Sequence, residues 1–120
     1  SGDLIVVFEE EDHSYFVRDG ENLILELHIS FPIAVLGGKI DIPTLNGKVG
    51  LKIPKGIQSG QILRLKGKGF PRIRSNHYGD QLVKVQINTP KKITRSTKRL
   101  IDDLKDNLYP IDNPFRKIEL

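Results

Sequence analysis

The segment FPIAVLGGKIDIPTLNGKVGLKIP, residues 31–54, predicts a β-hairpin preceded by a short helical turn. Apolar residues alternate with polar ones on both arms of this hairpin, a period typical of strands with one buried face; they are Ile40, Ile42, Val49, Leu51 and Ile53. Asn46-Gly47 tolerates two consecutive positive φ angles and favours a type I′ turn. Residues 31–36 are too few and too apolar for a surface helix, so we expect one buried turn that stops at Gly37-Gly38. The segment is typical of scaffold and carries no catalytic pattern.

Strand-like alternation continues on both sides of this hairpin. Residues 23–29, 62–65 and 82–87 each predict a strand, and the almost continuously apolar residues 3–8 predict one covered on both faces. From Thr94 the apolar period becomes helical, at Leu100, Ile101, Leu104 and Leu108. Thr94 suits an N-cap and Pro110 marks the end of this helix. The chain is therefore predicted to be mostly β, with one short buried helical turn and one C-terminal amphipathic helix.

A short internal sequence repeat suggests how the chain divides into domains. Gly2-Asp3 and Gly79-Asp80 are each followed by an apolar strand, which favours the end of one β-domain followed by a complete second copy. A turn-rich stretch at residues 18–22 marks the boundary between them. We expect residues 1–20 to close a preceding domain, 21–93 to form a β-domain, and 94–120 to form a helix and tail. With no methionine, even at position 1, the chain is expected to be a piece of a longer protein.

Composition excludes several classes of function. The 120 residues include no cysteine, which rules out disulfides, thiolate metal sites and thiol nucleophiles within this sequence. No apolar run approaches the ~20 residues of a membrane span, and no signal-peptide pattern opens the chain. The three histidines are not spaced to share a metal, and no Gly-x-Ser-x-Gly or phosphate-loop motif occurs. We therefore expect no enzyme activity, no metal and no cofactor.

Six short motifs, in order, resemble the C-terminal substrate-binding region of bacterial-type DnaJ J-domain co-chaperones. They are Gly2-Asp3-Leu4; His13, Phe16 and Arg18-Asp19-Gly20; Leu36-Gly37-Gly38; Ile42-Pro43-Thr44-Leu45-Asn46-Gly47; Gly67-Lys68-Gly69-Phe70-Pro71; and Gly79-Asp80. This resemblance covers roughly residues 2–90, and the closing helix fits it as well. It implies a small two-sheet β-sandwich, the end of C-terminal domain I followed by all of domain II. No His-Pro-Asp or Cys-x-x-Cys motif is present, so this segment is expected neither to stimulate a DnaK-class ATPase nor to bind zinc.

The resemblance also implies partners and site residues. Family members hold non-native polypeptides, called clients, in shallow apolar grooves and pass them to a DnaK-class chaperone in the cytoplasm. Phe16 matches a residue of the domain I groove, and analogy between the repeats places Leu23, Leu25, Ile40 and Ile42 in the domain II groove. The same residues alternate as a core would, which leaves a purely structural role open. Phe70 is either a client contact or a plug over the sandwich.

The tail suggests a homodimer. Residues 109–120 carry much apolar surface between two prolines, which a partner is expected to cover. The predicted dimerisation residues are Leu104, Leu108, Tyr109, Ile111 and Phe115.

Two alternatives remain. One is a dimerising scaffold without a client site of its own. The other is a nucleic-acid-binding module, suggested by the net charge of +4 and by a basic loop with aromatic residues; its candidates are Lys66, Lys68, Phe70, Arg72, Arg74 and Tyr78.

Overall fold

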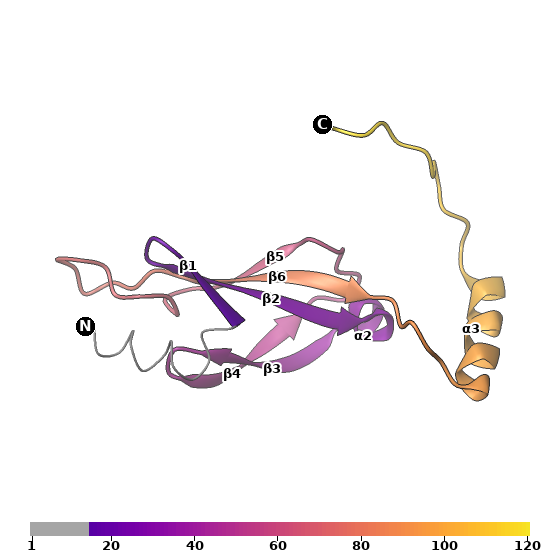
Figure 1. Ribbon diagram of the computed structural model, residues 1–120, viewed down its shortest axis with the longest axis horizontal. Helices are drawn as coiled ribbons and strands as arrows, with labels where there is room; N and C mark the ends of the chain where they lie inside the picture. The colour runs from indigo at the N-terminus through magenta and orange to yellow at the C-terminus, as the bar shows by residue number, and fades with distance from the viewer. Residues whose placement is uncertain (1–14) are drawn as a thin grey trace. The chain divides into compact units, whose positions relative to one another are not determined.

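A computed structural model describes residues 15–120, and the chain divides into two compact units, residues 1–89 and 90–120. The described part of the first unit, residues 15–89, holds six strands and one helical turn (Figure 1). Their bounds are β1 Phe16–Asp19, β2 Asn22–Ser30, α2 Phe31–Leu36, β3 Gly38–Thr44, β4 Gly47–Ile53, β5 Ile62–Leu65 and β6 Gln81–Asn88. The second unit holds one helix, α3 Arg95–Asn107. The strand predicted at residues 3–8 lies outside the described residues.

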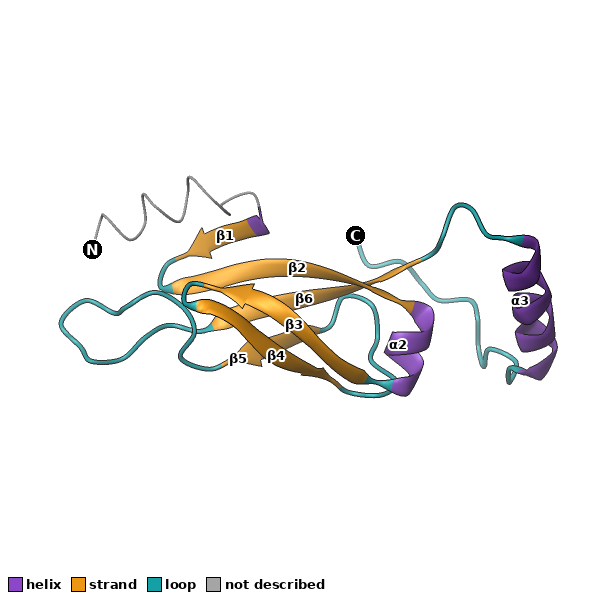
Figure 2. Cartoon of the chain, turned by 90° about the horizontal axis from the view of Figure 1, so that it is seen from below, coloured by secondary structure: helices purple, strands orange, loops and turns teal. Residues whose placement is uncertain are grey.

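The strands described in the first unit form two sheets (Figure 2). One sheet has the order β1-β2-β6-β5, with β2 and β6 parallel from the pair Leu23 and Gln81 to the pair Ser30 and Asn88. The other sheet is the antiparallel pair β3 and β4. Strand β1 pairs with β2, so residues 16–19 share a sheet with the segment that follows the expected boundary. The mostly β, two-sheet fold class is confirmed, while the division at residue 20 stays a prediction.

The core is formed by the inward faces of both sheets, as the alternating pattern predicts. Its buried residues are Leu25, Ile29, Ala34, Ile42, Leu51, Ile53, Ile57, Val83 and Val85. One buried polar side chain joins the sheets, because the Gln81 amide Nε2 donates to the carbonyl of Pro43 at 2.9 Å. Residues from β2, β3, β4 and β6 thus meet in a single apolar cluster.

The hairpin of β3 and β4 is present in the predicted place, but the predicted turn type is wrong. Thr44 and Gly47 pair across the turn, and Gly47 has a φ of 101° whereas Asn46 has no positive φ. The Thr44 hydroxyl stabilises this geometry by donating to the Gly47 carbonyl at 2.6 Å and accepting from the Asn46 amide at 3.2 Å. Because only one residue takes a positive φ, the loop cannot be a type I′ turn.

The helical turn α2 also differs from the expectation, because it is not buried as a whole. Ala34 is 2% exposed and is the one α2 side chain that enters the core. The four large apolar side chains, Phe31, Ile33, Val35 and Leu36, are all exposed. A single turn of helix directs its side chains all round its axis, so it cannot place every apolar residue on the sheet. The turn ends at Gly37, whose φ is 75° and whose amide donates to the Ile33 carbonyl at 2.8 Å.

In the second unit the predicted helix and its cap are confirmed. The Thr94 hydroxyl accepts from the Thr97 amide, and α3 ends at Asn107, before Pro110. None of the α3 side chains is buried. Across residues 15–120, no helix has both the length and the apolar character that crossing a membrane requires.

Candidate functional site

All six predicted client-binding residues lie in the first unit, and each is buried or half-buried. Leu23 and Ile42 are 0% and 1% exposed, Leu25 is buried, and Phe16 and Ile40 are half-buried against the core. Those in the two-sheet cluster pack on one another, which favours the structural role that the alternating pattern left open. The structure therefore gathers these residues, with the exception of Leu23 and Phe70, into one core cluster rather than along an open groove.

Phe70 has the position expected of a plug. Its ring is 4% exposed, and the Arg18 guanidinium lies over it at 4.2 Å from the ring centroid. Its amide donates to the Glu21 carbonyl at 2.7 Å, which ties the loop between β5 and β6 to the turn between β1 and β2. A cation over an aromatic face stabilises this closure.

Four large apolar side chains of α2 are exposed next to the buried Ala34, and we name Phe31, Ile33, Val35 and Leu36 the α2 patch. Leu36 is the most exposed of the four, at 76%. Pro32 at the start of the turn fixes its backbone and removes one amide donor, which suits the first turn of a helix. A short turn that begins at a proline and ends at a glycine thus holds four apolar side chains at the surface.

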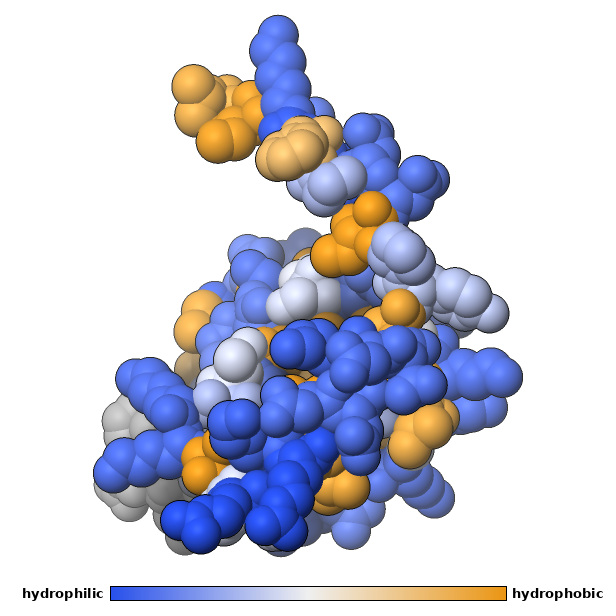
Figure 3. Space-filling model, turned by 90° about the vertical axis from the view of Figure 1, so that its right-hand side faces the viewer, coloured by the Kyte–Doolittle hydropathy of each residue, from blue (hydrophilic) through white to orange (hydrophobic). Residues whose placement is uncertain are grey.

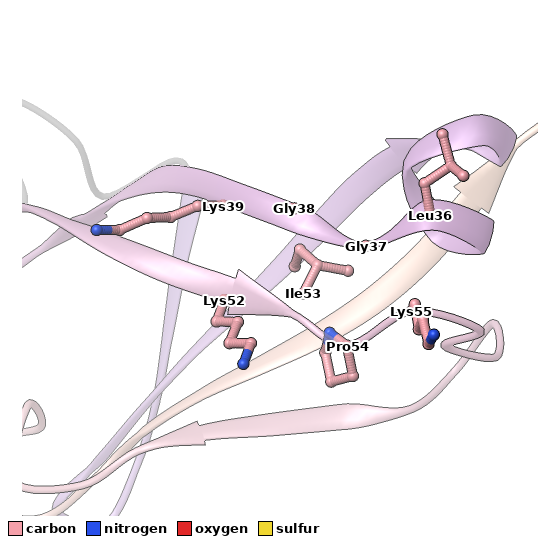
Figure 4. A pocket seen from close by; sticks show the side chains of 8 residues that line it. All are labelled: Leu36, Gly37, Gly38, Lys39, Lys52, Ile53, Pro54 and Lys55. Atoms are coloured by element: carbon pink, nitrogen blue, oxygen red, sulfur yellow. The ribbon is translucent and has the colours of Figure 1, made fainter.

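A shallow hollow of about 860 Å³ adjoins the α2 patch (Figure 4). It is lined by Leu36, Gly37, Gly38, Lys39, Lys52, Ile53, Pro54 and Lys55, from the end of α2, the start of β3 and the end of β4. Gly37 is required here, because a Cβ at this position would lie 2.8 Å from the Ile53 carbonyl oxygen. The lining combines apolar side chains with three lysines and, among the described residues, no carboxylate.

The outer edges of the small sheet offer a second means of contact. Within residues 15–120, β3 and β4 pair only with each other, so each presents one edge without a strand partner. Such an edge offers backbone amides and carbonyls to an extended peptide. The α2 patch, the hollow and the edge therefore provide apolar contacts and backbone hydrogen bonds close together. Figure 3 shows hydrophobic residues set among hydrophilic ones on the face that it presents.

A polar cluster of exposed side chains links the parallel strands β2 and β6. The His28 ring lies between two oxygens, Asn88 Oδ1 at 2.8 Å from Nδ1 and Glu26 Oε2 at 3.0 Å from Nε2. The bond to Asn88, and then the bond to Glu26, raises the pKa of His28. No group of three or more His, Cys, Asp or Glu residues in the described part of the chain is arranged to hold a metal. This cluster links two strands and carries no nucleophile.

The predicted dimerisation residues are all exposed in the second unit. Leu104 and Leu108 lie on and just after α3, while Tyr109, Ile111 and Phe115 follow in a segment without regular structure. Apolar side chains at helical spacing with charged ones between them give α3 an unpartnered apolar face within its own unit.

The α2 patch is the part of the site that the sequence reasoning missed. The available signal was that residues 31–36 contain five apolar residues and a proline in a stretch of one to two turns. Since no single turn buries all of them, some had to be exposed.

Comparison with known proteins places this geometry in a family. The family profile described as DnaJ C terminal domain matches residues 1–90. The chain is 48% identical over 108 residues to the chaperone protein DnaJ of Fusobacterium nucleatum, covering 90% of this chain and 28% of the relative. It is 42% identical over 112 residues to the chaperone protein DnaJ of Salinibacter ruber, covering 92% and 29%. For the chaperone protein DnaJ of a Geobacillus species the identity is 50% over 100 residues, covering 83% and 26%.

This chain therefore spans little more than a quarter of the length of these relatives. The family profile nevertheless covers both sheets of the first unit, from the described β1 to the end of β6. The fold, the motifs and these matches agree: the chain belongs to the DnaJ C-terminal domain family.

Proposed function

We propose that this segment binds non-native polypeptides for a DnaJ-type co-chaperone, and that the α2 patch with its adjoining hollow is the contact surface. The observation that carries this proposal is the exposure of four large apolar side chains on a turn whose small residue, Ala34, is the one in the core. An exposed apolar cluster beside an open strand edge suits an extended, apolar peptide. The client would be passed on to a DnaK-class chaperone in the bacterial cytoplasm, with the J-domain supplied from outside these 120 residues.

The predicted client residues then divide into two groups. Leu25 and Ile42 belong to the core cluster, and Leu23 is fully buried but is not part of that cluster. Phe16 and Ile40 are half-buried and remain candidates for direct contact. This division keeps apolar residues in the site but moves its centre from β2 and β3 to α2.

The strength of binding follows from the area that the patch offers. Full burial of a large apolar side chain contributes about 1.5–3 kcal/mol, and the α2 side chains are already partly covered. Ordering a flexible peptide offsets several kcal/mol of this gain. One site should therefore bind weakly, with a dissociation constant on the order of micromolar or above. Weak binding suits a protein that must release its client.

Two weak sites held together bind one client far more tightly. We infer that α3 and the following segment form a homodimer, because Leu104, Leu108, Tyr109, Ile111 and Phe115 present apolar surface without a partner in their own unit. A dimer raises the effective concentration of the second site once the first is occupied. If a chain truncated after Asn107 has the same oligomeric state in solution as residues 1–120, judged from its mass, this inference is wrong.

A titration tests the proposed client site. A fluorescently labelled, permanently unfolded apolar polypeptide is titrated with wild type, with the double variant Val35→Ser and Leu36→Ser, and with Ile73→Ser as a matched control. Ile73 is also highly exposed but lies on the loop between β5 and β6. We expect the double variant to weaken binding about tenfold, since two partly buried apolar contacts are lost, and the control to leave it unchanged. Equal binding by all three proteins would contradict the proposal.

A further inference from the structure

The loop between β5 and β6 encloses a second, smaller hollow of about 380 Å³. Lys66, Arg72, Asn76, His77, Tyr78 and Asp80 contribute to its lining. Five of these six side chains carry nitrogen or hydroxyl donors, which is the composition of a site for an anionic group. The hollow is separate from the α2 patch, since the two share no lining residue.

Hydrogen bonds between the two sides of the loop hold the hollow open. The Arg72 amide donates to the His77 carbonyl at 2.9 Å, and the Gly79 amide donates to the Phe70 carbonyl at 2.8 Å. A β-bridge also joins Pro71 and Tyr78. The donors therefore project from a hairpin-like frame, which lowers the cost of ordering them around a ligand.

The charges of the hollow favour a singly charged anion. Its one carboxylate, Asp80, is already neutralised, because it pairs with the Arg64 guanidinium and accepts from the Gly67 amide at 2.8 Å. Arg72 interacts with two carboxylates, because its Nε lies 3.9 Å from Glu21 Oε2 and its charge also helps to lower the pKa of Asp80. Lys66 makes no ion pair with any described residue. Because the exposed pair of Arg72 with Glu21 is long and weak, Arg72 is able to bind a further carboxylate together with Lys66.

We propose that this hollow binds a glutamate or aspartate carboxylate from an acidic segment of a partner polypeptide. Arg72 offers a planar guanidinium that suits a carboxylate, and Lys66 adds a second positive charge. Lys68 and Arg74 lie on the same loop. They add positive charge that further acidic side chains of the partner segment could contact. Nucleic acid fits less well, because single-strand binders stack bases on several aromatic rings. Here Tyr78 is the exposed aromatic of the loop, whereas Phe70 is buried.

The test is a titration with a labelled peptide containing four consecutive glutamates, a matched peptide with glutamines in their place, and a labelled single-stranded oligonucleotide. Lys66→Gln and Arg72→Gln are compared with Lys48→Gln, which removes the same charge from an exposed position on β4. Lys66→Gln breaks no ion pair within residues 15–120, so it is the variant least prone to disturb the fold.

We expect the glutamate peptide to bind and the glutamine peptide not to bind. Each variant of the hollow should weaken binding about two- to fivefold, and Lys48→Gln should leave it within twofold. Binding should also weaken as salt is added. Equal losses at Lys48 and Lys66 would reduce the effect to overall charge and overturn the proposal. Tighter binding of the oligonucleotide, or no binding of the glutamate peptide, would overturn it as well.

Discussion

Substitution of Gly79 by alanine should destabilise the first unit, because backbone atoms fill the space that a Cβ would need. A Cβ at position 79 would lie 2.2 Å from the carbonyl oxygen of Glu21 and 2.5 Å from its carbonyl carbon. Contacts this short cannot be relieved by rotating a side chain, since the opposing atoms belong to the backbone of the turn between β1 and β2. The loop or the turn must therefore move.

The loss of unfolding free energy follows from the contacts between Gly79 and the turn that joins β1 and β2. Overpacking of a tightly packed site costs about 1–3 kcal/mol. Movement also disturbs hydrogen bonds from Gly79 to Phe70, from Gly69 to Gly79 and from Phe70 to Glu21, with donor–acceptor distances of 2.8, 2.9 and 2.7 Å. Loss of one such bond costs about 1 kcal/mol. We expect Gly79→Ala to lower the free energy of unfolding by about 2–4 kcal/mol, a large part of the 5–15 kcal/mol typical of a domain.

Urea denaturation followed by circular dichroism measures this loss. Gly38→Ala is the matched control, because a Cβ at position 38 meets no atom within 4 Å and the residue has no positive φ. The control should stay within about 0.5 kcal/mol of wild type. If Gly79→Ala is as stable as Gly38→Ala, the reasoning from the close approach of Gly79 to the Glu21 backbone is refuted.

Three further substitutions test other parts of the structure. His28→Gln should cost more stability at about pH 5.5 than at about pH 8.5, measured by urea midpoints. The raised pKa of His28 means that its stabilising effect is full below its ordinary pKa of 6.5 and is lost as the pH rises through the raised value; a cost independent of pH would contradict this. Thr94→Ala should cost about 1 kcal/mol of helix stability, seen as fraying of the first turn of α3 by NMR, and an unchanged first turn would argue against the cap. Val83→Ala should destabilise by about 2–3 kcal/mol, since Val83 is fully buried, and a loss below 1 kcal/mol in thermal melts would mean that the core repacks around it.

Local patterns predicted much of the fold. The alternation along β3 and β4 and the Asn-Gly dipeptide located the hairpin, and Thr94 located the start of α3. These features depend on neighbours a few residues apart, so a single sequence carries them. The turn type was wrong because the Thr44 side chain hydrogen-bonds to the turn itself, so that only Gly47 needs a positive φ.

The parts that could not be predicted depend on contacts between distant segments. The parallel pairing of β2 with β6 joins residues about sixty positions apart, and no period in either strand identifies the other. The fit of Gly79 against Glu21, and the position of Arg18 over Phe70, arise only once the loop has folded back. For the same reason the alternation of Leu23, Leu25 and Ile42 did not distinguish a core from a groove.

Site-specific photo-crosslinking at the α2 patch tests the central claim most directly. A benzophenone amino acid replaces Leu36 in one protein and Ile73 in another, and each is irradiated with an unfolded apolar polypeptide. We predict a crosslink from position 36 that an excess of unlabelled polypeptide suppresses, and little or none from position 73. A crosslink from both positions alike, or from neither while the polypeptide still binds, would contradict the assignment of client binding to the α2 patch.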